Sequence, residues 1–380
     1  MVGIADLPLH YGHVPDYLLR IMKKMCDSIV HTMIYEFGED KLLERLSNPF
    51  WFQALNNAIG MDWDSSGSTT VLLSLLKQVI NKKSDGMVVI GGKGKNSTLI
   101  KKEVNSIPLN FNADSEEMKK CSALSAKTDT VLLQDGYDLY IHYMLISKSG
   151  KWAVIQQGMN PNNKFARRYH LSNVDNFECE PNSSISGFKG QAINIIQRNA
   201  YEQRKVFLEL INSDEKTILK DYYKALNTLN GNATLELNEE NAAISGFDRL
   251  NKINYYRPIK IEKLKKNLDI LKKSSMPTIS DALLEGVTAS TARALFLISD
   301  LIYNEPPSFE DPVNYPYDPF KYSFTIGGKD GIPYPVNKKT ADEVVNTMED
   351  IVTKSKIDGK SKYKAIIRLN KLVKDSNSLF

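Results

Sequence analysis

Carboxylate, imidazole and amide side chains crowd residues 127–160, and together they suit chemistry on a phosphate ester. Carboxylates and a histidine can hold Mg²⁺ or Mn²⁺, which polarises a phosphodiester. The carboxylates of this segment are Asp129, Asp135 and Asp138. We predict catalytic roles for Lys127, Asp135, His142, Gln156 and Gln157, and a metal site formed by Asp135, Asp138 and His142. The alternative is a polar network that only orders a sheet or contacts substrate.

Two strands of a β-hairpin must position these side chains. Residues 138–145 alternate between two sets of side chains, which is the period-two pattern of a strand. A turn at 148–150 precedes an apolar run that begins at Trp152. With the turn centred near Ser149, His142 lies across from Gln156 or Gln157, and a slip of one residue would reverse the faces.

Glycine-lysine loops are candidates for phosphate binding. The loop at 91–95 follows a short buried strand at 87–90 and precedes a helix near 98–105, which are the ingredients of an anion cradle. The Walker A spacing is absent, so no nucleoside triphosphatase is expected. Together with a second loop near 327–331 and two arginines, we predict phosphate contacts from Gly91, Gly92, Lys93, Lys95, Arg167, Arg168, Gly328 and Lys329. The alternative for the loops is a solvent-exposed turn.

A helical turn near residue 286 is a further candidate. One helix ends at Leu284, Gly286 permits a positive φ, and Thr288 can cap a second helix that ends near Tyr303. The free N–H groups and dipole of that helix can seat a phosphate. The pattern resembles the helix-hairpin-helix element with which many repair enzymes grip DNA, although Thr288 replaces the usual second glycine. This resemblance implies phosphate contacts from Gly286, Thr288, Ser290 and Thr291, whereas the alternative is an ordinary αα-hairpin.

Two further resemblances leave the chemistry open. In helix-hairpin-helix glycosylases an essential aspartate follows a Gly/Pro-rich loop, and Asp311 follows Pro306 and Pro307 in that order. The lysine nucleophile of the bifunctional enzymes is replaced by Ser290, so the resemblance implies a glycosylase without lyase activity; alternatively, Asp311 begins a turn. The residues around the β-hairpin also resemble restriction-endonuclease-like nucleases but lack their acidic-x-lysine pair.

The whole chain has the length and composition of a globular protein. Its 380 residues suffice for two domains, and 42% hydrophobic with 25% charged residues is ordinary. Three scattered cysteines argue against a disulfide framework. Without a signal-peptide pattern or an apolar run long enough to span a bilayer, we expect a cytoplasmic protein with no membrane partner. The N-terminal Asp6 and His10 are an alternative metal or catalytic pair, with His13 nearby.

Basic residues are unevenly distributed, although the net charge is only +4. Lysines and arginines cluster at 257–273 and at 351–380, on either side of the helical turn in sequence. We expect them to extend a surface that faces phosphates. Solvated helix faces are the alternative.

Periodicity predicts an α+β fold. Helices are expected at 16–37, 39–47, 50–59 and 69–80, before the strands, and the chain is mainly helical after about 187. We predict an α/β domain over residues 1–186, with a small sheet, the β-hairpin and the candidate active site. A mainly helical domain over 187–380 would contain the helical turn and a basic C-terminal helix.

Several blocks in order are similar to the domain-of-unknown-function 763 family of archaea and bacteria. They are Ala5–His10, Gly91–Lys95, Gln134–Tyr137, Trp152–Val154, Gln156–Asn160, Ala166–His170 and Gly327–Gly331. The resemblance covers residues 1 to about 340 and implies no particular mechanism. From the helical turn and the polar side chains of residues 127–160, we expect a DNA-binding protein of repair or processing, a nuclease dependent on Mg²⁺ or Mn²⁺, without an organic cofactor. The alternatives are a DNA glycosylase and a non-catalytic scaffold for DNA or RNA.

Overall fold

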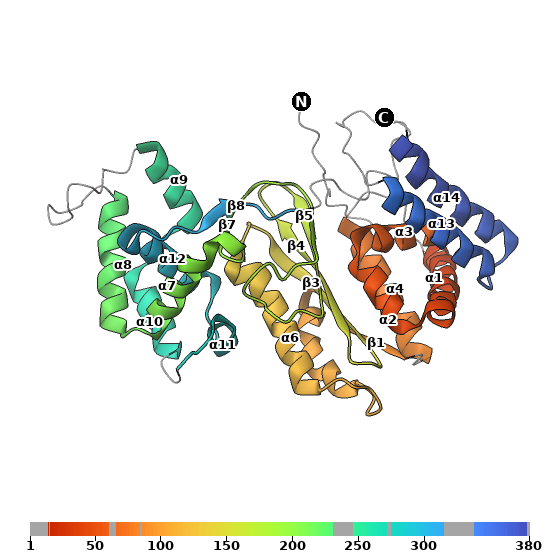
Figure 1. The fold of residues 1–380 in the computed structure, drawn as a ribbon, viewed down its shortest axis with the longest axis horizontal. Helices are drawn as coiled ribbons and strands as arrows, with labels where there is room; N and C mark the ends of the chain where they lie inside the picture. Colours follow the sequence, from red (N-terminus) through yellow and green to blue (C-terminus); the bar gives the residue numbers. More distant parts are fainter. Residues whose placement is uncertain are drawn as a thin grey trace.

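A central antiparallel sheet divides two groups of helices in the computed structural model (Figure 1). The structure describes residues 14, 16–60, 66–83, 86–230, 246–271, 275–314 and 338–377. Before the sheet come α1 (Asp16–Phe37), α2 (Glu39–Ser47), α3 (Pro49–Ile59) and α4 (Ser66–Lys83). These four helices confirm the helices that the periodicity of the sequence predicted. The α+β fold class is confirmed as well.

The sheet has the strand order β1-β3-β4-β5-β6, with every neighbouring pair antiparallel. Its strands are β1 (Met87–Lys93), β3 (Asp138–Ser147), β4 (Trp152–Asn160), β5 (Phe165–Ser172) and β6 (Ser184–Ser186). β3 and β4 form the predicted hairpin, and His142 lies opposite Gln156. Both the hairpin and one of its two expected registers are therefore confirmed.

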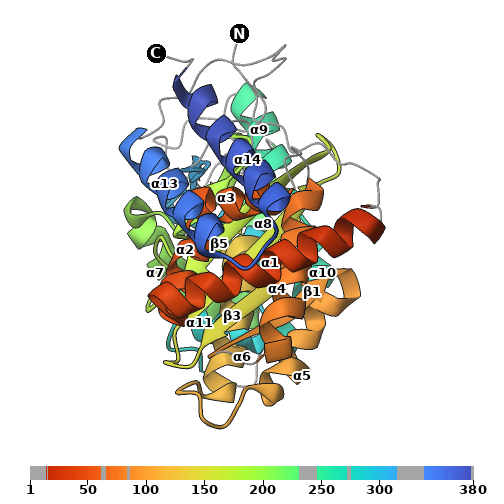
Figure 2. The same cartoon turned by 90° about the vertical axis from the view of Figure 1, so that its right-hand side faces the viewer.

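The two faces of this sheet belong to different cores. Met144 and Val154 point into a core with α6 (Ser115–Lys127), whereas Leu145 and Ile155 point into a core with α1 to α4. Two C-terminal helices, α13 (Lys338–Lys354) and α14 (Gly359–Asn377), complete the second core by packing against α3. Viewed from that end, they lie beside α1 (Figure 2). Short turns η1 (Gly94–Leu99), α5 (Ile100–Glu103) and η2 (Val104–Ser106) link β1 to α6.

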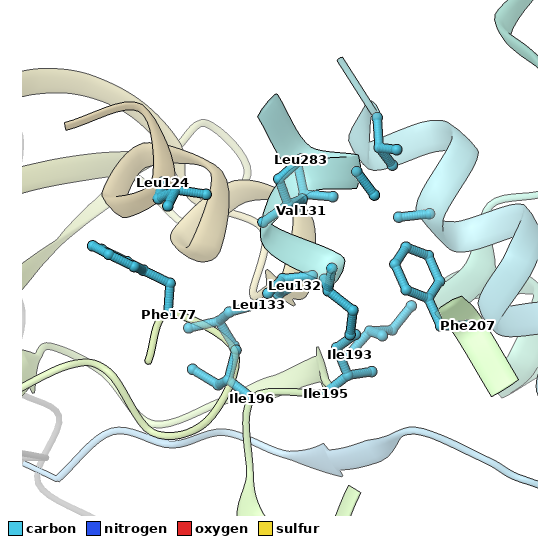
Figure 3. Packing of buried hydrophobic residues seen from close by; sticks show 14 of the residues in the cluster. Leu124, Val131, Leu132, Leu133, Phe177, Ile193, Ile195, Ile196, Phe207 and Leu283 are labelled. Carbon is cyan, nitrogen blue, oxygen red and sulfur yellow. The ribbon is translucent and has the colours of Figure 1, made fainter. Parts of the chain in front are cut away.

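A three-stranded sheet of β2 (Leu133–Gln134), β7 (Gln191–Asn194) and β8 (Ser308–Glu310) joins the central sheet to the second group of helices. That group contains η4 (Arg198–Ala200), α7 (Tyr201–Asn212), α8 (Glu215–Asn230), α9 (Gly246–Tyr256), α10 (Ile261–Leu271), α11 (Ile279–Glu285) and α12 (Ala289–Tyr303). Figure 3 shows Leu283 of α11 beside Val131, in the same apolar cluster as Ile193 of β7. One core thus runs through both sides of the boundary predicted near residue 186, a boundary that stays a prediction.

The basic C-terminal segment lies away from the helical turn. Figure 1 places α13 and α14 at the end of the molecule opposite α11 and α12, beyond the central sheet. Only the other basic segment neighbours the turn, since α10 packs against α12. The expectation that both basic clusters extend one surface around the turn is therefore wrong.

The cysteines agree with the expectation from their spacing. Cys26, Cys121 and Cys179 are all free thiols. Among the helices of the described ranges, none has both the length and the apolar character that crossing a bilayer requires.

Candidate functional site

A polar cavity of about 470 Å³ lies between the sheets and the second group of helices. Asp129, Asp135 and Asp138 line it from the side of the β-hairpin. Ala289 and Arg293 of α12 line it as well, together with residues of α9. Part of the predicted catalytic region therefore shares a cavity with the helix that follows the predicted phosphate-binding turn.

A π-helical turn places Asp129 at this cavity. The turn, η3 (Thr128–Leu132), continues α6 and ends at β2. It buries Val131 and Leu132 in the core while Asp129, itself 1% exposed, lines the cavity. Single π-turns often occur at functional sites.

Asp129 accepts hydrogen bonds from two amide side chains. Gln156 Nε2 donates to Oδ2 at 2.5 Å, and Asn182 Nδ2 donates to Oδ1 at 2.9 Å. Burial raises the pKa of this carboxyl to about 7, although both amide donors lower it. A carboxyl with a pKa near neutrality can both accept and release a proton under physiological conditions. Sequence reasoning included Asp129 among the carboxylates but centred the chemistry on Asp135.

His142 continues the same hydrogen-bonded chain. Its Nδ1 lies 2.7 Å from Gln156 Oε1, and its Nε2 lies 2.8 Å from Ser122 Oγ. Burial lowers the pKa of His142, and the bond to Gln156 opposes this only in part. The imidazole is therefore neutral at pH 7, and both of its nitrogens already have partners.

Asp135 belongs instead to a buried ion network. Arg167 Nη1 donates to Asp135 Oδ2 at 2.6 Å, and Arg167 Nη2 donates to Asp311 Oδ2 at 2.6 Å. The Tyr169 hydroxyl also donates to Asp135, at 2.6 Å. Burial lowers the pKa of Arg167, but the two carboxylates raise it by more, so the arginine is permanently charged.

This network changes the roles expected for its members. Arg167 is 1% exposed and already holds two carboxylates, so the phosphate contact predicted for it does not fit. Asp311 also accepts from Gly190 N at 2.7 Å, which leaves no free carboxylate for base excision. Neighbouring Arg168 is fully buried on the other face of β5, over the ring of Phe52, and a phosphate role does not fit it either.

The predicted metal ligands are not gathered into one site. Asp138 is exposed at the cavity, whereas His142 is hydrogen-bonded to Ser122 and Asp135 is paired with Arg167. Among the residues that the structure describes, no three His, Cys, Asp or Glu side chains are grouped so that they could hold a metal ion. Gln157 points to the other face of the sheet and donates to the Tyr140 hydroxyl. Of the predicted catalytic set, His142 and Gln156 are hydrogen-bonded to each other.

The helical turn has the geometry expected from the sequence. Gly286 ends α11 with φ 113°, and Thr288 caps α12 by accepting from Thr291 N. Thr288 Oγ1 also lies 3.1 Å from Ser290 Oγ, and Thr291 is buried. Lys127 donates to Val287 O at 2.9 Å, which ties the turn to the end of α6. Lys127 therefore supports the turn, and phosphate binding at the turn stays a prediction.

The first glycine-lysine loop serves the sheet. Gly91 has φ 101°, and a Cβ there would collide with the carbonyl oxygen of His142, so glycine allows β1 to approach β3. Gly92 is closely packed against Asn96. Lys93 and Lys95 are exposed, but neither lines the cavity. Predicted sites at Asp6, His10, Gly328 and Lys329 lie outside the described residues.

Two arginines line the cavity, of which Arg257 was predicted only as part of the basic segment 257–273 and Arg293 was not predicted at all. A signal existed for one of them: Arg293 and Asp300 are the only charged residues of α12. A lone cation in an otherwise apolar helix indicates a special environment. Asn251 and Asn254, which line the cavity from α9, carried no comparable signal.

A family model described as Protein of unknown function (DUF763) matches residues 3–336. The chain belongs to this family. The resemblance to this family is thereby confirmed. Neither the curated proteins nor the solved structures that were compared with this DUF763 chain include a match.

Proposed function

We propose that this protein binds DNA at the cavity between Asp129 and Arg293 and hydrolyses a phosphodiester bond there. One observation carries the proposal: two regions with separate predicted roles meet at the same cavity. Carboxylates line one side, and α12 brings Arg293 and its N-terminal residue Ala289 to the other. Cationic groups and a helix N-terminus attract a phosphate, and carboxylates can activate water.

Asp129 is the proton acceptor of the proposed reaction. As a water oxygen bonds to phosphorus, one water proton passes to the Asp129 carboxylate, the bond from phosphorus to the leaving oxygen breaks, and that oxygen takes a proton from solvent. The two amide donors leave part of the carboxylate's acceptor capacity free. Arg293 offsets the negative charge that builds on the phosphate oxygens.

The metal dependence expected from the sequence is part of this proposal. Mg²⁺ is often bound by one or two carboxylates, with phosphate oxygens and water completing its shell. Asp138 is the exposed carboxylate at the cavity and would supply such a ligand. A preformed group of three protein ligands is therefore unnecessary.

Incubation with labelled single- and double-stranded DNA, with and without Mg²⁺ or Mn²⁺, tests the proposal. We expect strand breaks with wild-type protein, and a rate at least about 100-fold lower for Asp129→Asn, the loss typical of a general base. Asp175→Asn, at an exposed position outside the cavity, is the matched control.

Each alternative predicts a different result. Strands that stay intact with either metal would overturn the nuclease. Breaks that appear only after alkali treatment would indicate a glycosylase. Salt-sensitive binding that leaves all strands intact would indicate a scaffold.

A further inference from the structure

Two arginines line the cavity without belonging to the carboxylate network. Arg257 directly follows α9, and Arg293 lies in the second turn of α12. Burial lowers the pKa of Arg293, and the nearby charge of Arg257 lowers it further. Arg293 is half-buried and Arg257 is exposed. Their like charges repel each other, and an anion bound between them would remove the repulsion.

Neither arginine is paired with a carboxylate among the residues that the structure describes, although aspartates line the other side of the cavity. Arg293 Nη1 donates to the neutral Gln134 Oε1 at 2.6 Å, and its buried Nε has no hydrogen-bond partner in the structure. The planar fork of a guanidinium fits two phosphate oxygens at once.

Arg257 adopts a backbone conformation that its sequence disfavours. Its φ is 42°, in the left-handed region, and it precedes Pro258. Residues other than glycine rarely occur there, and a following proline favours extended backbone instead. Such conformations persist where the surrounding structure imposes them, and they are concentrated at functional sites.

The helices that carry the two arginines are fixed to each other. Lys252 and Tyr256 of α9 both donate to Asp300 of α12, Tyr256 at 2.8 Å. This fixes the backbone positions of Arg257 and Arg293 before any ligand arrives, which lowers the entropic cost of binding. Asn251 and Asn254 bring amide groups to the same cavity.

We propose that Arg257 and Arg293 form a clamp for one phosphate group, with the guanidinium groups donating to its non-bridging oxygens. The identification of that phosphate as a backbone phosphodiester of DNA rests on the proposed function. The clamp itself does not, because it would accept the same group in inorganic phosphate or in a nucleotide.

Two measurements test the clamp on the full-length protein. Thermal unfolding is followed with inorganic phosphate against chloride at equal ionic strength. Binding of a fluorescent 20-nucleotide oligonucleotide, single- or double-stranded, is titrated at several salt concentrations without divalent metal. The variants are Arg257→Gln and Arg293→Gln. Arg198→Gln is the matched control, since this exposed arginine pairs with Glu180, does not line the cavity, and its loss changes the net charge equally.

We expect phosphate to stabilise the wild type and the control but neither clamp variant. Oligonucleotide affinity should fall at least about tenfold in Arg293→Gln and less than about twofold in the control. The slope of log affinity against log salt should decrease by about one in each clamp variant.

Failure of the clamp and failure of the proposed function give different results. Equal phosphate stabilisation and equal DNA affinity in Arg293→Gln and in the control would overturn the clamp while DNA binding stands. Phosphate stabilisation that depends on both arginines, without DNA binding by the wild type, would support the clamp and overturn the proposed function. No phosphate effect in any protein, together with unchanged salt slopes, would overturn the clamp.

Discussion

Arg167 and Arg293 lie near the same cavity, yet their surroundings differ in one decisive respect. Arg167 faces two carboxylates, a backbone carbonyl and the ring of Tyr137. Arg293 faces a neutral amide and a second arginine. A buried charge whose partners are supplied by the protein stabilises the fold only as part of its network. A charge that lacks them is suited to a ligand, so the counter-charges, and not the residue type, indicate which arginine can bind.

Substitution of Arg167 should produce the largest effect on stability. Arg167→Met leaves Asp135 and Asp311 buried without a cation, which should lower the free energy of unfolding by about 3–5 kcal/mol. Urea denaturation measures this loss. Arg293→Met makes the same chemical change but leaves no carboxylate uncompensated, so we expect a change below about 1 kcal/mol. Equal losses in the two variants would contradict the comparison.

Asp129 extends the comparison to carboxylates, since its partners are neutral amides and not a guanidinium. Its pKa is raised in the folded state to about 7, mainly by burial, from the ordinary carboxyl value of 3.8. The folded protein therefore binds this proton more tightly than the unfolded chain does. The stability that protonation of Asp129 contributes to the folded state is fully present below about pH 4 and is lost as the pH rises through 7.

Asp129→Asn should remove this loss, because the amide resembles the protonated acid. Relative to wild type, the variant should gain stability between pH 5 and pH 8, by up to about 4 kcal/mol. Asn182 can adapt to the amide, since its Oδ1 has no hydrogen-bond partner in the structure. Urea denaturation across this pH range gives the difference, with Asp138→Asn as the exposed control. Parallel pH profiles for wild type and Asp129→Asn would argue against a raised pKa.

Local and long-range features differed in how far the sequence could predict them. The β-hairpin, and the placement of His142 opposite either Gln156 or Gln157, followed from strand alternation and a turn, which are local properties; the structure selects Gln156. The helical turn at Gly286 was local as well. Arg167 was predicted to bind phosphate, and its engagement by Asp311 could not be foreseen because the two lie 144 positions apart in sequence. The approach of Arg257, which was predicted only as part of a basic segment, to Arg293 was missed for the same reason, since only the packing of α9 on α12 brings the two together.

Gln156 tests whether a neutral buried group, like Arg167, stabilises the fold through partners that the protein supplies. It bridges His142 and Asp129 and also donates to Ser125 O at 3.0 Å. Gln156→Leu keeps a similar volume but leaves His142 and Asp129 each without one hydrogen-bond partner. This should lower the free energy of unfolding by about 2–3 kcal/mol. A double-mutant cycle with His142→Leu should show coupling, since removing both groups costs less than the sum of the single losses. Additive losses would mean that the two side chains do not act as a connected pair.

The smallest effect is expected on the opposite face of β5. Ser186 lies across from Arg168 and is buried, and its hydroxyl has no hydrogen-bond partner in the structure. Ser186→Ala removes a polar group whose burial is not compensated, so stability should stay within about 1 kcal/mol of wild type or rise. Ser122→Ala is the control, because that buried hydroxyl contacts His142 Nε2, and its removal should cost about 1–2 kcal/mol. Thermal and urea unfolding of the two variants compare a satisfied hydroxyl with an unsatisfied one. A loss of stability in Ser186→Ala as large as that in Ser122→Ala would show that Ser186 has a partner in solution. The difference between partnered and unpartnered groups, drawn from Arg167 and Arg293, would then not extend to this face.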